Sequence, residues 1–204
     1  MTLEWVGLRC RRRLGVDRGP PLQCSGERGA ALVETAILIP VVLAITFGLI
    51  EFSSAYQSSS VASAASRSAA RVASAEALLP NYATDAATAA ATALHTIPNN
   101  EPVEMWVYRA AANGYPESGN FTSCTTNCIK YAWLPTTKAF DTANPTGNGW
   151  PYTSQNACNQ NAWDSVGVYV KLNHKFLTGL FGSKITLADH AVFRLEPAPT
   201  QLCP

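Results

Sequence analysis

The stretch RGAALVETAILIPVVLAITFGLIEF, residues 28–52, decides the architecture of this 204-residue chain. Residues 35–50 within it carry no charge, and their only polar side chains belong to two threonines. Extending the run back to Ala30 includes Glu34 and gives a helix of about 30 Å at about 1.5 Å per residue. That length matches the hydrocarbon thickness of a bilayer. The stretch therefore predicts a transmembrane helix over residues 30–52.

Charge is distributed unevenly around this run. Residues 1–29 hold six arginines and three acidic residues, a net charge of +3, whereas the rest of the chain has a net charge of −2. Positive charge beside a membrane helix marks its cytoplasmic end. Nucleic-acid binding is disfavoured, because no aromatic residue is interleaved with the arginines. We expect residues 1–29 to be a cytoplasmic basic leader and the C-terminal part to be extracytoplasmic.

Pro40 and Glu51 give the span two further features. Pro40 removes a backbone donor, so a kink or a local break is expected there. Glu51 marks the far edge of the span, and Phe52 and Tyr56 would lie at the membrane interface.

Residues 53–79 contain nine alanines and nine serines. Alanine favours helix and serine is only mildly unfavourable, so the helix is expected to continue to Pro80. The small side chains would permit close approach of a neighbouring helix, and packing on the chain's own domain explains them equally well. A second helix is expected from Asn81, as N-cap, to about His95. Together they form an Ala-rich extracytoplasmic segment, 53–97.

Residues 98–204 are expected to form an exported α+β domain. Alternating apolar residues predict strands over 103–109, 163–173 and 185–196, and one or two helical turns are expected over 174–181. Residues 111–162 are too long for an ordinary connection, so they form either an excursion pinned by disulfides or a functional surface loop. The predicted fold is thus α+β, with a small, mostly antiparallel sheet of about three strands and a long disulfide-pinned loop.

The six cysteines divide at the predicted span. Two of them, Cys10 and Cys24, precede it and would stay in the reducing cytoplasm. The four that follow it would be exported: Cys124, Cys128, Cys158 and Cys203. An even number in an exported domain indicates two disulfides, with three pairings open. A metal site with a histidine is the weaker alternative, because the Cys-x3-Cys spacing is loose for zinc and no second close pair exists.

The segment from Arg28 to Glu34 carries the most specific chemistry. Gly29 closes the basic leader, and Glu34 is the fifth residue after it. This segment resembles the processing site of type IV prepilins, in which a membrane aspartyl peptidase cuts after the glycine. The resemblance implies that Gly29 lets the scissile bond enter a tight catalytic cleft, and that the cut creates a positive amine at Ala30. A carboxylate in hydrocarbon is costly unless it is paired, and this amine, on the same or a neighbouring subunit, is its natural partner.

Two other interpretations of this segment stay open. An uncleaved signal anchor would use Glu34 at the positive end of the helix dipole. A secretory signal peptide cut after Ala64 is the weakest interpretation, because its leader would be far too long and its cut too far past the apolar run.

The stretch 28–52 resembles the N-terminal signature of TadE-like proteins of the tight-adherence (Tad) pilus system, which are similar to type IV prepilins. The resemblance lies in Arg-Gly-x-Ala, Val-Glu, a proline in mid-helix and a Glu-Phe exit. The following helix with Arg67 and Arg71 is also similar, and so is the closing ITLADHAVFRLEP. Related major pilins commonly have a tyrosine after the glutamate, so Thr35 and the long domain favour a pseudopilin over the filament subunit.

The resemblance implies a non-catalytic minor pilin or pseudopilin that helps to assemble or anchor Flp-type pili, which serve adhesion. It implies processing by a prepilin peptidase at Gly29, Ala30 and Glu34. The implied partners are pilin and other pseudopilin subunits, the inner-membrane assembly platform and membrane lipid, without nucleic acid. The expected location is the cytoplasmic (inner) membrane, as a single-pass protein, or the pilus itself. No cofactor and no metal are expected.

An enzyme is disfavoured by the residues themselves. The histidines, His95, His174 and His190, are scattered and belong to no hydrolytic motif. Residues 164–168 lack the second serine of the metal motif of von Willebrand A domains, which related pilus proteins carry. There is no phosphate loop and no dinucleotide fingerprint. The alternative function is a membrane-tethered extracytoplasmic binding domain that is not processed and does not enter a pilus.

Overall fold

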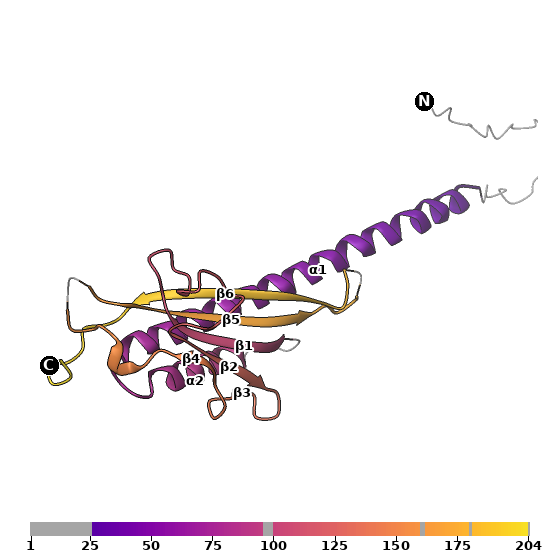
Figure 1. The fold of residues 1–204 in the computed structure, drawn as a ribbon. Helices are drawn as coiled ribbons and strands as arrows, with labels where there is room; N and C mark the ends of the chain where they lie inside the picture. The colour runs from indigo at the N-terminus through magenta and orange to yellow at the C-terminus, as the bar shows by residue number, and fades with distance from the viewer. Residues whose placement is uncertain (1–25, 96–99, 160–161, 180, 204) are drawn as a thin grey trace, which may run out of the picture. The chain divides into compact units, whose positions relative to one another are not determined.

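The computed structural model describes residues 26–95, 100–159, 162–179 and 181–203, and Figure 1 shows its fold. Its contacts separate two compact units, one ending at Leu43 and the other beginning at Ala44. The described residues of the first unit are the beginning of a long helix. The second unit contains the rest of that helix, a shorter helix and a sheet.

The long helix, α1, spans Gly26–Ala75, as the composition predicts. Pro40 lies inside α1 without interrupting it, so the local break expected there is absent. The helix ends five residues before Pro80, in a turn where Leu78 takes a left-handed φ of 65°.

The second half of α1 packs on the sheet of its own unit. Its buried positions recur every three or four residues, which is the spacing of one helix face. These positions are Ser58, Ala62, Ala65, Ser66, Ala69, Ala70, Ala73 and Ser74. The small side chains on this face thus belong to the domain core, whereas Arg67 and Arg71 lie on the exposed face.

Helix α2 spans Tyr82–Leu94 and confirms the predicted second helix. Asn81 occupies the N-cap position, but its side chain makes no capping hydrogen bond. Instead, the Thr84 hydroxyl donates to the Asn81 carbonyl oxygen at 2.9 Å. One face of α2, rich in alanine, is buried in the same core as α1.

The sheet has six strands in the described residues, which corrects the expected number of about three. All pairings are antiparallel, in the order β3-β2-β1-β5-β6, and β4 pairs with β2. The bounds are β1 Asn100–Arg109, β2 Cys128–Leu134, β3 Ala139–Phe140, β4 Thr146–Gly149, β5 Ser165–Lys175 and β6 Lys184–Arg194, with a short 3-10 helix, η1, at Tyr152–Ser154.

Strands β1, β5 and β6 are the three that the alternating apolar residues predict. The three additional strands all lie in the segment 111–162, where the sequence analysis expects only an excursion. In β2, Ile129, Tyr131 and Trp133 alternate with other residues, but β3 and β4 are too short to show any period. These short strands form because β2 provides an edge for them.

The expected helical turns over 174–181 are wrong. His174 and Lys175 continue β5 and pair with Ile185 and Lys184 of β6. The antiparallel ladder extends to the end of both strands, so its hydrogen bonds take the backbone groups that a helical turn would need.

The sheet buries side chains on both faces. On one face, Met105 and Val107 of β1 pack with the alanines of α1 and α2. On the other face, Trp106, Tyr108 and Tyr169 are covered by the excursion after β1, where the ring of Phe121 stacks on that of Tyr169 at 4.3 Å. The excursion thus protects an aromatic layer that would otherwise face solvent.

Candidate functional site

Gly29, Ala30 and Glu34, the predicted processing residues, lie in α1 near its N-terminal end, and all three are exposed. A Cβ built on Gly29 would meet no neighbouring atom within 4 Å, so packing does not explain the glycine. Ala30 and Glu34 are four residues apart and share one face of the helix. This arrangement suits an interaction between an amine at Ala30 and the carboxylate of Glu34.

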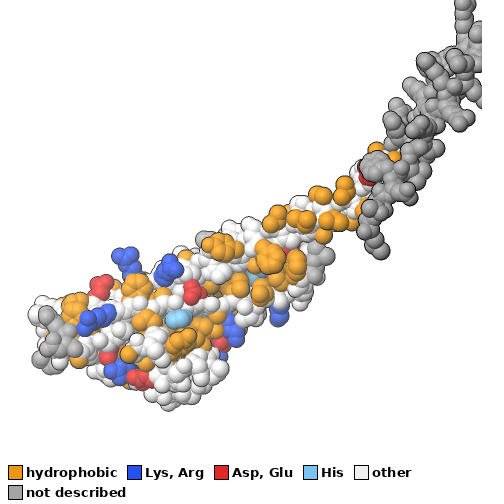
Figure 2. All heavy atoms as spheres, turned by 90° about the horizontal axis from the view of Figure 1, so that it is seen from above, with side chains coloured by type: hydrophobic (Ala, Val, Ile, Leu, Met, Phe, Trp, Pro, Cys, Tyr) orange, Lys and Arg blue, Asp and Glu red, His pale blue; other side chains and the backbone are white. Residues whose placement is uncertain are grey.

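The apolar surface of α1 is the largest exposed hydrophobic feature of the described residues. Large apolar side chains from Leu32 to Ile50 are exposed, and Figure 2 shows them in orange along the helix. The described residues contain one helix that is long and apolar enough to cross a membrane, and it is this one. The helix suits a single-pass membrane anchor.

Glu51 ends this apolar surface and is held by a distant segment. Its side chain is only 1% exposed. One carboxylate oxygen accepts a hydrogen bond from the Leu177 amide at 3.0 Å, and the other accepts bonds from the Thr178 amide at 2.5 Å and the Thr178 hydroxyl at 2.8 Å. The carboxylate therefore ties the connection between β5 and β6 to α1.

His174 makes a second link between α1 and β5. It is fully buried, and its Nδ1 lies 2.8 Å from the Ser58 hydroxyl of α1 and 3.3 Å from Asn100 Oδ1. Its ring also makes a T-shaped contact with the ring of Phe176. The histidine acts here as a packed structural residue between the helix and the sheet.

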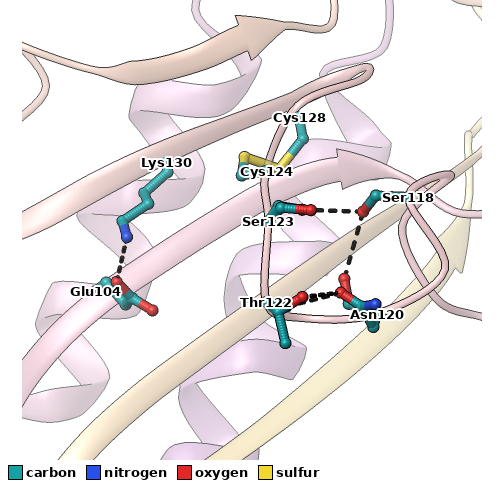
Figure 3. The surroundings of a disulfide bond; sticks show 8 residues. All are labelled: Glu104, Ser118, Asn120, Thr122, Ser123, Cys124, Cys128 and Lys130. Atoms are coloured by element: carbon teal, nitrogen blue, oxygen red, sulfur yellow. Dashed lines mark hydrogen bonds and ion pairs between the residues drawn. A yellow bond between two sulfur atoms is a disulfide. The ribbon is translucent and has the colours of Figure 1, made fainter.

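Two disulfides join the four cysteines after the predicted span. Cys124 pairs with Cys128 across the start of β2, and Cys158 pairs with Cys203 near the C-terminus. Figure 3 shows the first bond beside a turn in which the Ser118 hydroxyl donates to the Ser123 carbonyl oxygen at 2.9 Å. The disulfide-pinned loop of the predicted fold is therefore present.

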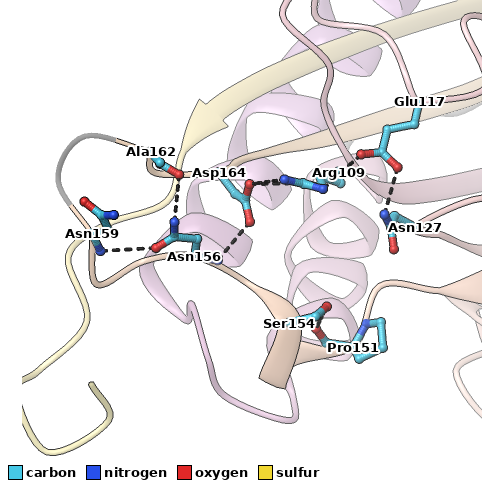
Figure 4. A network of polar contacts seen from close by, with 9 residues as sticks. All are labelled: Arg109, Glu117, Asn127, Pro151, Ser154, Asn156, Asn159, Ala162 and Asp164. Carbon is cyan, nitrogen blue, oxygen red and sulfur yellow. Dashed lines mark hydrogen bonds and ion pairs between the residues drawn. The ribbon is translucent and has the colours of Figure 1, made fainter. Parts of the chain in front are cut away.

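A polar network joins the end of β1 to the β1–β2 and β4–β5 connections, at the end of the sheet opposite His174 (Figure 4). Arg109 donates to Asp164 Oδ1 from Nε at 3.0 Å and from Nη2 at 2.7 Å, and its Nη1 lies 3.1 Å from Glu117. The other Asp164 oxygen accepts the Asn156 amide at 2.8 Å. The hydrogen bonds to Asp164 raise the pKa of the Arg109 guanidinium. Asp164 is thus a structural anion that fixes the start of β5.

The histidines are not assembled into a reactive group. The ring of His95 contacts the Lys138 carbonyl oxygen at 2.6 Å, and His190 packs against the rings of Tyr115 and Phe121. Within the described ranges, no set of three or more His, Cys, Asp and Glu side chains is arranged to hold a metal ion.

Residues 29–71 match the family model of TadE-like proteins. The N-terminal part of this chain is TadE-like. The match begins at Gly29 and contains Glu34, Pro40 and Glu51, so the predicted family resemblance is confirmed over these residues. TadE-like proteins are associated with the Tad pilus system, and the match covers 43 of this chain's 204 residues. No curated protein and no solved structure matches the chain.

The predicted site residues form two separate sets, the processing residues and the disulfide cysteines. The structure keeps Gly29, Ala30 and Glu34 together in one helix and joins the cysteines in two pairs. Sequence reasoning missed the role of Glu51, which it assigned only to the edge of the span. A carboxylate placed directly after an apolar run needs hydrogen-bond donors. The position of Glu51 in the sequence therefore could have predicted that another segment donates to it.

Proposed function

We propose that this chain is a TadE-like minor pilin or pseudopilin that helps to assemble or anchor Flp-type pili of the tight-adherence system. The observation that carries the proposal is the TadE-like match itself, which starts at the glycine of the predicted processing site. The exposed apolar helix that follows supplies a membrane anchor before assembly and a packing surface for other subunits afterwards.

In the proposed processing step, a prepilin peptidase hydrolyses the peptide bond between Gly29 and Ala30. Water adds across the bond, which leaves a carboxylate on Gly29 and an ammonium group on Ala30. The bond lies within α1, so the helix must unwind locally before the chain can enter a catalytic cleft. Glycine lowers that cost, because it is about 1 kcal/mol less favourable in a helix than alanine.

The new ammonium group of Ala30 then pairs with Glu34, on the same chain or on a neighbouring subunit. One helical turn separates the two positions on a single chain. The pairing neutralises both charges at the beginning of an apolar helix, where an unpaired charge is unfavourable. The exposed side chains from Leu32 to Ile50 can then pack against the helices of pilin or pseudopilin subunits without a charged gap.

The proposal also includes the partners of the chain and its topology in the membrane. The proposed partners are the prepilin peptidase, pilin and other pseudopilin subunits, the inner-membrane assembly platform and lipid. The leader 1–29 would be cytoplasmic, residues 30–52 transmembrane, and the Ala-rich segment 53–97 and the domain 98–204 extracytoplasmic.

N-terminal sequencing of the membrane-extracted protein, with and without the prepilin peptidase, tests the proposal. We expect the mature chain to begin at Ala30 when the peptidase is present and to keep the leader when it is absent. Gly29→Leu should block the cut, because the larger side chain does not fit the cleft. Ala36→Leu, placed after the cleavage site in the same apolar helix, is the matched control and should be processed normally.

The competing function is a membrane-tethered binding domain that stays unprocessed. If the wild-type chain keeps residues 1–29 in cells that process other prepilins, the pseudopilin function is wrong. Co-isolation with pilin subunits after crosslinking provides the second criterion, because a tethered domain would be recovered without them.

A further inference from the structure

The connection between β5 and β6 lies against α1 at the end of its apolar surface. Glu51 receives three hydrogen bonds from Leu177 and Thr178, which fix the first part of the connection beside the helix. The two partners are 126 and 127 residues away along the chain. These three hydrogen bonds hold the β5–β6 connection beside Glu51 of α1.

Phe181 carries this contact further into the apolar run. A Cβ built on Gly48 would lie 3.8 Å from Cζ of Phe181, and Gly48 is buried. The rings of Phe52 and Phe181 have centroids 5.4 Å apart. Gly48 precedes Glu51 by three residues, so Phe181 lies about 4.5 Å further along the helix axis, inside the uncharged run.

The side chains that form this contact remain largely exposed. Leu177 is 59% exposed, Phe181 is 53% exposed and Phe52 is 66% exposed. Figure 2 shows orange side chains gathered where α1 meets the domain. Neighbouring residues of the helix, Leu49 and Ile50, are exposed as well. Phe52, Leu177 and Phe181 therefore form a patch that continues the apolar surface of the predicted membrane helix. We expect the patch and the helix to be in the same apolar environment.

We propose that Leu177 and Phe181, together with Phe52, form a membrane anchor that inserts into the bilayer at the boundary between headgroups and acyl chains. Lipid is the partner that covers this patch, because the patch is continuous with the membrane helix and lies beside the last uncharged turn of that helix. Aromatic side chains are the residues that favour this boundary. Lys184, exposed at the base of β6, places an ammonium group where lipid phosphates lie.

The hydrogen bonds to Glu51 explain how a charged side chain lies at this depth. Its carboxylate oxygens are satisfied by the protein, so the acid needs no water at the boundary. Phe52 belongs to the helix, whereas Leu177 and Phe181 belong to the β5–β6 connection, so the helix and the connection both attach to the bilayer. Together they fix the rotation of the domain about the helix axis relative to the membrane.

Tryptophan fluorescence of the full chain in vesicles tests this proposal. The variant Phe181→Trp is reconstituted in phosphatidylcholine and phosphatidylglycerol, with bromine on the acyl chains near the glycerol backbone. The wild-type emission is subtracted to remove the native tryptophans. Tyr152→Trp is the control, because Tyr152 is exposed on η1, away from the patch. Leu177→Trp is a second reporter if Phe181→Trp does not fold.

We expect brominated lipid to quench the added emission at residue 181 at least twofold more than that at residue 152, and aqueous iodide to show the opposite order. Equal quenching by iodide at both positions would place the patch in water and overturn the proposal. Protection from both quenchers would mean that a second copy of the chain covers the patch, and this also overturns it. The test needs neither processing nor pili, so its result is independent of the proposed function.

Discussion

Glu34 is the residue whose charge the proposed function depends on. Glu34→Ala should leave processing largely intact but reduce the yield of surface pili, because the ammonium group of Ala30 would then be unpaired beside an apolar phase. An unpaired charge costs about 2.5–3.5 kcal/mol at the centre of a membrane helix, and less near its end. Mature mass and pilus yield are the measurements. Glu34→Gln should behave like alanine if charge pairing is the mechanism, and wild-type yield for the glutamine variant would contradict it.

Gly167 allows β5 to pass beneath a buried ring. A Cβ at this position would lie 2.2 Å from Cζ of Tyr108, which is itself fully buried. Gly167→Ala should lower the free energy of unfolding by about 1–3 kcal/mol, because the ring must shift within a packed layer. Denaturant unfolding in detergent measures this loss. In a Tyr108→Leu background the same substitution should cost clearly less, and equal costs in both backgrounds would rule out the clash.

Glu76 gives the domain a pH dependence of known sign. Burial, together with the nearby Asp85 carboxylate, raises the pKa of Glu76 above its usual range. The folded state therefore holds the proton more tightly than the unfolded state. Stability is highest below the unfolded pKa and decreases as the pH rises through the folded pKa.

The substitution Glu76→Gln should therefore stabilise the protein at pH 7 and have little effect below pH 4. Solvent still reaches part of this half-buried group and screens its charge, so we expect only about 0.5 kcal/mol, or about 1–2 °C in the melting temperature of the detergent-solubilised protein. Asp141→Asn, on a loop away from this pair, is the control. A larger gain at pH 4 than at pH 7 would give the wrong sign.

At the scale of elements, the two disulfides constrain very different lengths of chain. Cys124 and Cys128 are four residues apart, whereas Cys158 and Cys203 are 45 apart. Loop-closure entropy predicts a loss of about 2 kcal/mol for the short loop and about 4 kcal/mol for the long one. Paired serine variants in detergent unfolding experiments measure both losses. The prediction fails if the short loop contributes more, or if the wild-type protein carries four free thiols or a bound metal.

The packing of α1 shows how an element can serve two environments. Its first half presents large apolar side chains outward, and its second half buries alanine and serine on the sheet. Small residues suit the second role because they let the helix approach the strands closely. The amino-acid sequence alone is compatible with two packing partners for this face, a neighbouring helix or the chain's own domain. For the buried face the partner is the chain's own domain, and the face with Arg67 and Arg71 stays exposed.

At the scale of the whole molecule, the charge asymmetry predicts the orientation in the membrane. We expect Cys158 and Cys203 outside the cytoplasm and Cys10 inside. In intact spheroplasts that carry the uncleaved Gly29→Leu variant, which keeps Cys10, a membrane-impermeant maleimide should label the first two cysteines after treatment with reductant. Cys10 should react only after the membrane is opened. Labelling of Cys10 in intact spheroplasts, with Cys158 protected, would show that the topology is the reverse of the predicted one.

The amino-acid sequence is enough to predict the features that depend on neighbouring residues. The uncharged run 35–50, helix α2 after Asn81 and the alternating valines of β5 each show a local period, and local periods predict elements. The predicted processing segment is equally local, because Gly29 and Glu34 lie within one turn and a half of helix.

The features that join distant parts of the chain become visible only in the folded protein. The short strands β3 and β4 exist because β2 offers them an edge, and His174 belongs to a strand because β6 pairs with it. Glu51 accepts hydrogen bonds from Leu177 and Thr178 because the fold brings the β5–β6 connection beside α1. Such contacts depend on how the whole chain is folded, and no period or spacing in the sequence encodes which distant groups will meet.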